Sequence, residues 1–150
     1  MPRVVSTARI LSRVGEHAVG WLAIGGVGIA LSHGDRRRAW VRATGSVATA
    51  HAAAVLVKRV VRRPRPDDPR IQVLVGTPSR LSFPSAHVTS TTAAAVAYRP
   101  LLAVGAVAPA AVVTTMAISR LVLGVHFPTD VAVGALGGWA VVVTLRRVRA

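Results

Sequence analysis

The sequence predicts an all-α protein that crosses a membrane several times. Of its 150 residues, 52% are hydrophobic and only 16% are charged, and the mean hydropathy is +0.52. The apolar residues gather in five long runs, and arginines gather at the ends of these runs. Uncharged runs flanked by cations are typical of transmembrane helices. We therefore expect a polytopic bundle of about five spanning helices, formed as a single integral-membrane domain over residues 1–150.

The N-terminal half contains a short interfacial segment and two of the expected spans. Residues 1–14 interleave arginines with aliphatic side chains, which predicts an amphipathic helix lying on the membrane surface. The first apolar run follows Glu16 and extends to Ser32, and the second covers residues 39–61. Prolines are expected to end this second helix and to begin a loop that reaches about residue 82; they are Pro64, Pro66 and Pro69.

Three further apolar runs complete the bundle. The third covers residues 84–97 and is punctuated by Arg99-Pro100, and the fourth covers residues 101–118, where Pro109 should produce a kink. The fifth covers residues 131–145 and contains several glycines. With five crossings, the ends of helices two and four and the starts of helices three and five lie on one membrane face.

The turn between the fourth and fifth runs holds the most informative residues. Arg120 and Asp130 are the only formal charges between Arg99 and Arg146, and ionisable groups beside hydrocarbon indicate a functional site. Pro128 suits the first position of a helix, which places His126 just before the helix and Asp130 in its first turn. The carboxylate can then bind one imidazole nitrogen and leave the other for a substrate. The alternative is a polar connector with a helix-capping acid.

The predicted topology brings this turn together with other polar residues on the same face. Lys58, Arg65 and Arg120 supply three cations, a suitable cradle for a phosphate ester. Ser85 and Ala86 lie where the third helix begins, and a helix N-terminus offers free N–H groups to an anion. The alternative is that the cations form a cluster that binds lipid headgroups.

Three motifs in this region resemble those of the type 2 phosphatidic acid phosphatase (PAP2) superfamily. They are Lys58 and Arg65-Pro66 separated by six residues, then Pro84-Ser85-Ala86-His87, then Ser119-Arg120, His126 and Asp130 at spacings of five and three residues. The resemblance implies a PAP2-type core and a phosphoric monoester hydrolase. It implies His126 as the nucleophile that forms a phosphohistidine, Asp130 as the group that fixes its tautomer, and His87 as the acid and then the base. Lys58, Arg65, Ser85, Ala86 and Arg120 would bind the phosphate, and no metal or cofactor is expected.

The sequence departs from the family pattern in two places. Members usually have glycine where Ala86 stands, so the loop would be strained if that position needed a positive φ. Many members also have six crossings, whereas the first is here reduced to the short N-terminal segment.

The substrate expected from a site at a membrane face is a lipid phosphate. Residues 12–17 and 71–92 and the start of the fifth helix resemble small actinobacterial phosphatases that convert decaprenylphosphoryl-5-phosphoribose to decaprenylphosphoryl-ribose for cell-wall arabinan synthesis. Phosphatases of undecaprenyl pyrophosphate, phosphatidic acid and phosphatidylglycerophosphate share the catalytic residues and remain alternatives. The arginines that would contact the remainder of the headgroup, such as a second phosphate, are Arg59, Arg62, Arg63 and Arg80. Glu16 is expected to pair with a neighbouring arginine at the membrane interface, with contact to the headgroup as the alternative.

Other classes of protein fit less well. The net charge of +14 suggests nucleic-acid binding, but only 4% of residues are aromatic and the cations lie at the ends of apolar runs, so no nucleic-acid partner is expected. A soluble haloperoxidase would not need five apolar runs, and a non-catalytic scaffold that binds anionic lipid would tolerate loss of His126. We expect a multi-pass protein of the plasma membrane. The basic N-terminus favours a cytoplasmic site, although the arginines outside the predicted phosphate-binding set, those of the N-terminus included, divide evenly between the two faces. The sequence leaves the oligomeric state open.

Overall fold

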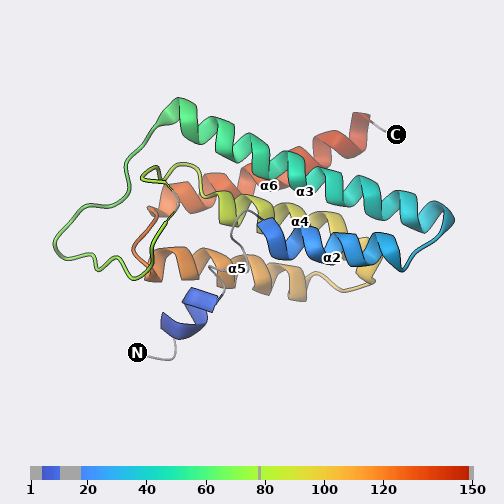
Figure 1. Ribbon diagram of the computed structural model, residues 1–150, viewed down its shortest axis with the longest axis horizontal. Helices are drawn as coiled ribbons and strands as arrows, with labels where there is room; N and C mark the ends of the chain where they lie inside the picture. The colour runs from blue at the N-terminus through green and yellow to red at the C-terminus, as the bar shows by residue number, and fades with distance from the viewer. Residues whose placement is uncertain (1–4, 11–17, 78, 149–150) are drawn as a thin grey trace.

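The computed structural model describes residues 5–10, 18–77 and 79–148, and within these ranges it is a helical bundle without a β-strand (Figure 1). A short helix at residues 5–10 precedes five longer ones. These are α2 (Val19–Ala30), α3 (Gly34–Val61), α4 (Ala86–Leu102), α5 (Val107–Val122) and α6 (Pro128–Val148). Each of the five predicted apolar runs therefore forms one helix. The helix at residues 5–10 lies inside the predicted amphipathic segment, whose remaining residues fall outside the described ranges.

The third of these long helices, α4, forms the centre of the bundle, because all the other long helices pack against it. Its buried face contributes Ala93, Ala97 and Tyr98 to a core that includes Trp40 of α3. The rings of Trp40 and Tyr98 are 5.1 Å apart between centroids. Polar groups join the helices as well, since the Tyr98 hydroxyl donates to the carbonyl oxygen of Trp21 at 3.0 Å. The small residues of α4 allow this close packing, which suits helices in lipid.

The helices differ in how well each alone would span a membrane. Among the described helices, only α6 is both long and apolar enough by length and composition, with 21 residues. The apolar helices α2 and α5 are shorter, at 12 and 16 residues. The 28-residue α3 is long enough but carries basic residues in its first and last turns.

Two prolines act differently from the prediction. Pro100 does not end the third helix, because α4 continues through it to Leu102. Pro109 does not kink the middle of the fourth helix, because α5 begins later than predicted, at Val107, and Pro109 lies in its first turn. The N–H groups of a first turn have no partner within the helix, so proline costs little there.

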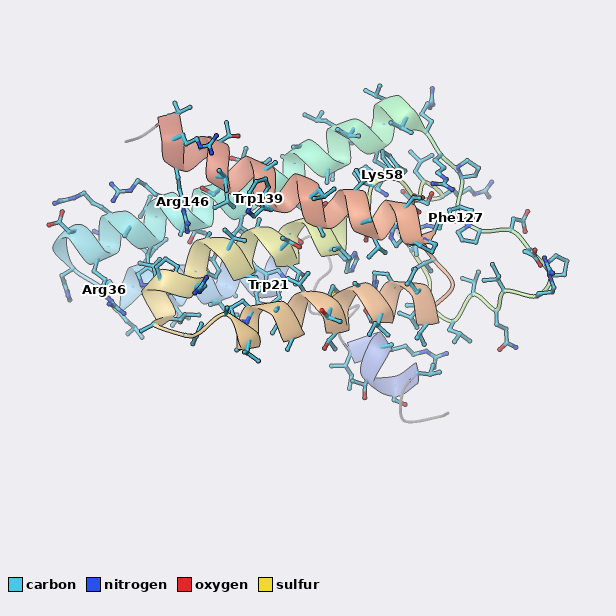
Figure 2. All side chains as sticks on the ribbon, turned by 180° about the vertical axis from the view of Figure 1, so that it is seen from behind. Trp21, Arg36, Lys58, Phe127, Trp139 and Arg146 are labelled. Carbon is cyan, nitrogen blue, oxygen red and sulfur yellow. The ribbon has the colours of Figure 1, made fainter. Side chains whose placement is uncertain are left out.

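The bundle has two chemically distinct ends. Figure 2 shows Lys58 and Phe127 at one end and Arg36 and Arg146 at the other. The end with Lys58 also receives the start of α4, the turn between α5 and α6, and the long loop 62–85 (Figure 1). The predicted convergence of the polar motifs on one face is therefore found in the structure.

Close packing of α6 on α4 leads to the first testable prediction. A Cβ added at Gly138 would overlap the carbonyl oxygen of Thr89 and lie 3.0 Å from the Cβ of Thr92, whereas a Cβ at Gly137 would meet nothing within 4 Å. We expect Gly138→Ala to lower the stability by about 1–3 kcal/mol through overpacking. The matched variant Gly137→Ala should raise the stability by about 0.5–1 kcal/mol, because alanine is the better helix former. Thermal unfolding in detergent measures both, and equal effects of the two variants would contradict the packing of these helices.

Candidate active site

The loop 62–85 folds back over the end of the bundle and positions two arginines there. Its two arms pair in an isolated antiparallel bridge between Pro64 and Leu81. The Ser82 N–H donates to the carbonyl oxygen of Arg63 at 2.8 Å, and the Arg65 N–H donates to that of Arg80 at 3.2 Å. Because Ser82 lies just before α4, this pairing holds Arg63 and Arg65 beside the start of that helix.

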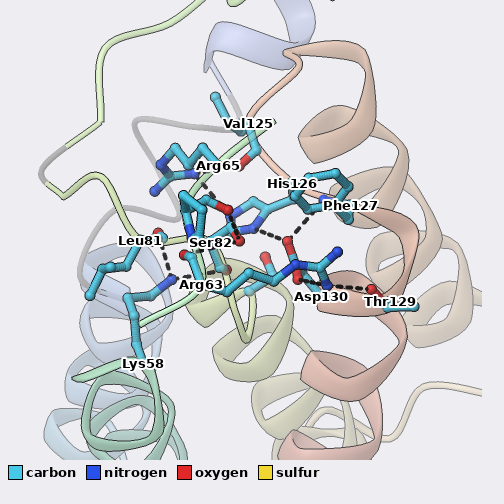
Figure 3. A network of polar contacts seen from close by, with 12 residues as sticks. Lys58, Arg63, Arg65, Leu81, Ser82, Val125, His126, Phe127, Thr129 and Asp130 are labelled. Atoms are coloured by element: carbon cyan, nitrogen blue, oxygen red, sulfur yellow. Dashed lines mark hydrogen bonds and ion pairs between the residues drawn. The ribbon is translucent and has the colours of Figure 1, made fainter. Parts of the chain in front are cut away.

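His126 and Asp130 form the buried centre of the site (Figure 3). The helix α6 begins at Pro128, as predicted, so that His126 precedes it and Asp130 lies in its first turn. The Nδ1 of His126 is 3.4 Å from the Oδ2 of Asp130, and the two side chains are 4% and 0% exposed. That Oδ2 also accepts the Phe127 N–H at 2.9 Å. A carboxylate beside Nδ1 favours the tautomer with its proton on that nitrogen, which leaves a lone pair on Nε2.

Arg65 lies beside this second imidazole nitrogen. Its Nη1 is 3.5 Å from the Nε2 of His126 and donates to the carbonyl oxygen of Val125 at 2.6 Å. Its Nε donates to the carbonyl oxygen of Ser79 at 3.0 Å. Burial lowers the pKa of Arg65, and Asp130 opposes that shift. The guanidinium is thus fixed where an anion bound to Nε2 would meet it.

Lys58 and Arg120 complete the predicted set of three cations. Both are buried, at 9% and 1% exposure. The Lys58 ammonium donates to the carbonyl oxygens of Leu81 and Ser82, at 3.0 Å each, and an ammonium has a third proton to offer to an anion. The Arg120 Nε donates to the Ser119 hydroxyl at 3.2 Å. Arg65 is within electrostatic reach of both side chains, so the structure brings the three cations together.

The start of α4 contributes the second predicted motif. The Ser85 N–H donates to the carbonyl oxygen of Asp130 at 3.0 Å, which joins the starts of α4 and α6. The Ser85 hydroxyl is buried and has no hydrogen-bond partner among the described residues. Ala86 is the first residue of α4 and is not among the residues with positive φ, so alanine in place of glycine causes no strain. His87 follows it in the first turn of α4, half-buried.

Arg63 has a position that sequence reasoning missed. Its Nη1 donates to the Oδ1 of Asp130 at 3.1 Å and to the hydroxyl of Thr129 at 2.8 Å. Its guanidinium carbon lies 4.0 Å from the centroid of the Phe127 ring. The sequence predicts Arg63 among the residues that contact a substrate headgroup, but in the structure its side chain binds the buried carboxylate of Asp130. Nothing in the spacing distinguishes it from its basic neighbours.

The other predicted headgroup residues lie further from this centre. Arg59, Arg62 and Arg80 are exposed at the same end of the bundle, where they are accessible to a ligand but do not join the buried cluster. Arg62 is the residue that ends α3, in a left-handed conformation. Glu16 lies outside the described residues.

The short helix at residues 5–10 packs against the active-site end, which the sequence did not predict. Ala8 is buried against Leu123 and Val125 of the turn between α5 and α6. The carbonyl oxygen of Ala8 accepts a hydrogen bond from Nη2 of Arg120 at 3.4 Å. The Nε of Arg9 donates to the carbonyl oxygen of Leu74 at 2.9 Å, which ties this helix to the long loop. The helix therefore helps to hold Arg120 and the loop in place.

The burial of His126 makes the stability of the protein depend on pH. Burial lowers the pKa of His126 to about 4; Asp130 opposes the shift, and Arg65 and Lys58 reinforce it. The unfolded chain accepts a proton here below about pH 6.5, but the folded protein does so only near pH 4, so stability falls as the pH falls through this window. Between about pH 7 and about pH 5, thermal unfolding in detergent should show a larger loss for wild type than for His126→Gln. Equal losses would contradict the burial of a neutral imidazole.

Comparison with known proteins gives a consistent family assignment. The model of the PAP2 superfamily matches residues 39–150. A decaprenylphosphoryl-5-phosphoribose phosphatase of Mycolicibacterium smegmatis is 58% identical over 135 residues, which cover 89% of this chain and 72% of that protein. The phosphatase of the same name from Mycobacterium tuberculosis is 55% identical over 137 residues, covering 91% and 76%.

A solved structure shares the fold. The crystal structure of a transmembrane PAP2-type phosphatidylglycerolphosphate phosphatase from Bacillus subtilis superposes with a TM-score of 0.76, covering 99% of this chain and 78% of that one at 22% identity. The predicted transmembrane helical bundle with a PAP2-type core is thus confirmed.

Proposed function

Because this chain belongs to the PAP2 superfamily, we propose that it is an integral-membrane lipid phosphatase that hydrolyses a phosphomonoester through a phosphohistidine. The observation that carries the proposal is the surroundings of His126. One of its nitrogens faces the carboxylate of Asp130 at 3.4 Å and the other faces Arg65 at 3.5 Å. An imidazole held in this way is a nucleophile with a cationic cradle at its reactive nitrogen.

The first step transfers the phosphoryl group to the enzyme. The lone pair on Nε2 of His126 attacks phosphorus, and the bond from phosphorus to the ester oxygen breaks. His87 donates a proton to that oxygen, which leaves as the alcohol. Lys58, Arg65 and Arg120 stabilise the charge on the phosphoryl oxygens, to which the Ser85 hydroxyl and the first N–H groups of α4 also donate. As the imidazole becomes positively charged, the carboxylate of Asp130 stabilises it.

The second step regenerates the enzyme. Water attacks phosphorus on the side that the alcohol has left, and His87, now neutral, accepts the proton of that water. The bond between phosphorus and Nε2 breaks, which releases inorganic phosphate and restores the neutral His126. The cations supply the charge stabilisation for both steps, so we propose that the reaction needs no metal.

The substrate we propose is decaprenylphosphoryl-5-phosphoribose, which would yield decaprenylphosphoryl-ribose. The identity of 58% and 55% to two phosphatases of that name supports this choice. A second feature also fits, because this substrate carries a phosphodiester in addition to its reacting phosphate. The exposed side chains of Arg59, Arg62 and Arg80 at the active-site end are suited to that second charge.

The experiment that tests this function is phosphate release by the purified protein in detergent with a chelator present. The substrates compared are prenylphosphoryl-ribose 5-phosphate, prenyl pyrophosphate, phosphatidic acid and phosphatidylglycerophosphate. We expect chelator-resistant release that is fastest for the first of these. A faster reaction with another lipid would reassign the substrate, and a folded protein that releases phosphate from none of them would favour a scaffold that binds anionic lipid.

Arg63 is expected to act as a positioning residue in this reaction. Arg63→Gln removes the partner of a buried carboxylate. We expect a loss of about 10–100-fold, the scale found when the hydrogen-bond partners of metal ligands are removed. The loss should appear in kcat for every phosphate ester, including a small soluble one without a second phosphate. The matched variant Arg62→Gln alters an exposed neighbour and should leave the soluble ester unaffected. If Arg63→Gln instead raises only KM for two-phosphate lipids, Arg63 binds the headgroup.

We further propose that the protein lies in the plasma membrane with its active site on the cytoplasmic face. The basic N-terminal segment supports this orientation. The chain contains no cysteine. Labelling of a single introduced cysteine therefore shows on which side of the membrane that position lies. A membrane-impermeant maleimide added to intact cells should label Arg37→Cys, at the opposite end, and not Arg62→Cys. The reverse pattern would place the site outside.

A further inference from the structure

A cavity open to the outer surface of the bundle lies in the half that is remote from the active site. The helices α5 and α6 both pack on α4 but hardly contact each other, and Figure 2 shows α4 running between them. The space between these three helices is a cavity of about 780 Å³. Trp139 of α6 forms part of its wall and is 53% exposed, so the cavity reaches the outer surface of the bundle. Its volume is within the range of about 300–1,000 Å³ that is usual for ligand sites.

This cavity is separate from the catalytic centre. A buried cluster of Val88, Met116 and Val131 fills the space between the same three helices at the active-site end. The cavity begins beyond that cluster, where Thr92 forms part of its floor. It ends at the last turns of α4 and α6, which lie at the opposite end of the bundle (Figure 2). It is therefore suited to a molecule of the opposite leaflet and not to the reacting phosphate.

Arg99 and Arg146 line the far end of the cavity, and a proline in α4 allows Arg146 to be held there by a hydrogen bond. Pro100 has no N–H, so it leaves the carbonyl oxygen of Val96 without the usual donor four residues later. Arg146 supplies a replacement, because its Nη2 donates to that oxygen at 2.8 Å. Arg99 lines the same end. The described residues that line the cavity include no acid to neutralise these cations.

We propose that this cavity binds a phospholipid with an anionic headgroup, whose acyl chain lies along Trp139 and whose phosphate meets Arg99 and Arg146. The hydrocarbon core of a membrane contains no water to fill an apolar cavity, so lipid chains occupy it. The pair of uncompensated cations at its end selects an anionic headgroup, and an arginine near a membrane surface strengthens such binding by about fivefold. Because α4 forms the floor of the cavity and begins at Ala86, next to Ser85, a lipid bound here braces the helix whose first turn forms part of the active site.

Quenching of tryptophan fluorescence by brominated lipid tests this site. The protein is reconstituted in phosphatidylcholine vesicles that contain a small fraction of either phosphatidylglycerol or phosphatidylcholine brominated on the acyl chain. We expect brominated phosphatidylglycerol to quench wild type at a lower fraction than brominated phosphatidylcholine does. This preference should vanish in Trp139→Phe, which removes the tryptophan that lines the cavity and leaves Trp21 and Trp40. It should fall about fivefold in Arg99→Gln, which leaves the contact between Arg146 and Val96 intact.

Two further variants make the test specific. Arg37→Gln alters an exposed cation at the same end of the bundle that does not line the cavity, and it should keep the preference. Ala110→Leu fills the cavity from α5 without changing charge, and it should abolish the preference even if Arg99→Gln fails to fold. Equal quenching of wild type by the two lipids would overturn the proposal. An equal loss in Arg37→Gln and Arg99→Gln, or a preference that survives in Ala110→Leu or Trp139→Phe, would also overturn it.

Discussion

Replacing His126 by alanine should lower the rate of phosphate release by more than about 10³-fold, as loss of a nucleophile does in other hydrolases. In the described part of the structure, the imidazole lies between Asp130, 3.4 Å from its Nδ1, and Arg65, 3.5 Å from its Nε2. The three cations and Ser85 would remain, so the variant should still bind its substrate. We therefore expect the loss in kcat, with KM or the binding constant little changed.

The matched control for this variant is His33→Ala. His33 is exposed and precedes α3 at the opposite end of the bundle, so its loss should leave turnover unchanged. Phosphate release in detergent, with the folded state checked by thermal unfolding, compares the two. A His126→Ala protein that is folded and retains more than a tenth of the wild-type rate would rule out this histidine as the nucleophile.

Asp130→Asn should also produce a large loss, of about 10⁴-fold in kcat, the scale of the same exchange in a serine protease triad. Asp130 is fully buried and accepts from Arg63 at 3.1 Å and from the Phe127 N–H at 2.9 Å, beside Nδ1 of His126. Asparagine preserves the shape but not the charge. Its amide N–H can donate a hydrogen bond to an unprotonated Nδ1, which would favour the tautomer whose Nε2 is protonated and unable to attack.

Asp35→Asn is the control for the loss of one negative charge away from the active site. Asp35 is an exposed acid in the first turn of α3, at the opposite end of the bundle. Rates for both variants should be measured from about pH 5 to pH 9, since a change of tautomer lowers the rate at every pH whereas a change of pKa only moves the profile. A normal maximal rate for Asp130→Asn at a shifted pH would show that the carboxylate tunes the pKa and does not orient the ring.

Much of the fold and most of the candidate site could be predicted because they depend on helix starts and apolar runs, which are recognised from residues close together in the sequence. A helix start at Pro128 fixes where His126 and Asp130 lie on one turn, and the number of apolar runs fixes which helix ends meet. Lys58, Arg65, Ser85 and Arg120 follow from that topology, and the structure brings them to one end. The negative φ of Ala86 also follows once α4 is known to begin there.

The remaining features depend on contacts between segments that are distant in the sequence. Arg63 reaches Asp130 only because the arms of the loop pair at Pro64 and Leu81, and its neighbours in the sequence are equally basic. The packing of Ala8 against Leu123 has no local signal either. The continuation of α4 through Pro100 also depends on a distant residue, because Arg146 supplies a donor to the carbonyl that Pro100 leaves without its helical partner.

The most direct test of the proposed mechanism is to trap the phosphorylated enzyme. Labelled lipid phosphate is mixed with wild type and with His87→Gln, the reaction is stopped in alkali to preserve phosphohistidine, and the label is located by mass spectrometry. We predict a label on His126 in both proteins. His87→Gln slows its formation as well as its hydrolysis, so the expected difference is a label that persists longer once the substrate is removed, because that variant lacks the base that activates water in the second step. A label on another residue, or a burst of released alcohol without any labelled protein, would contradict the account.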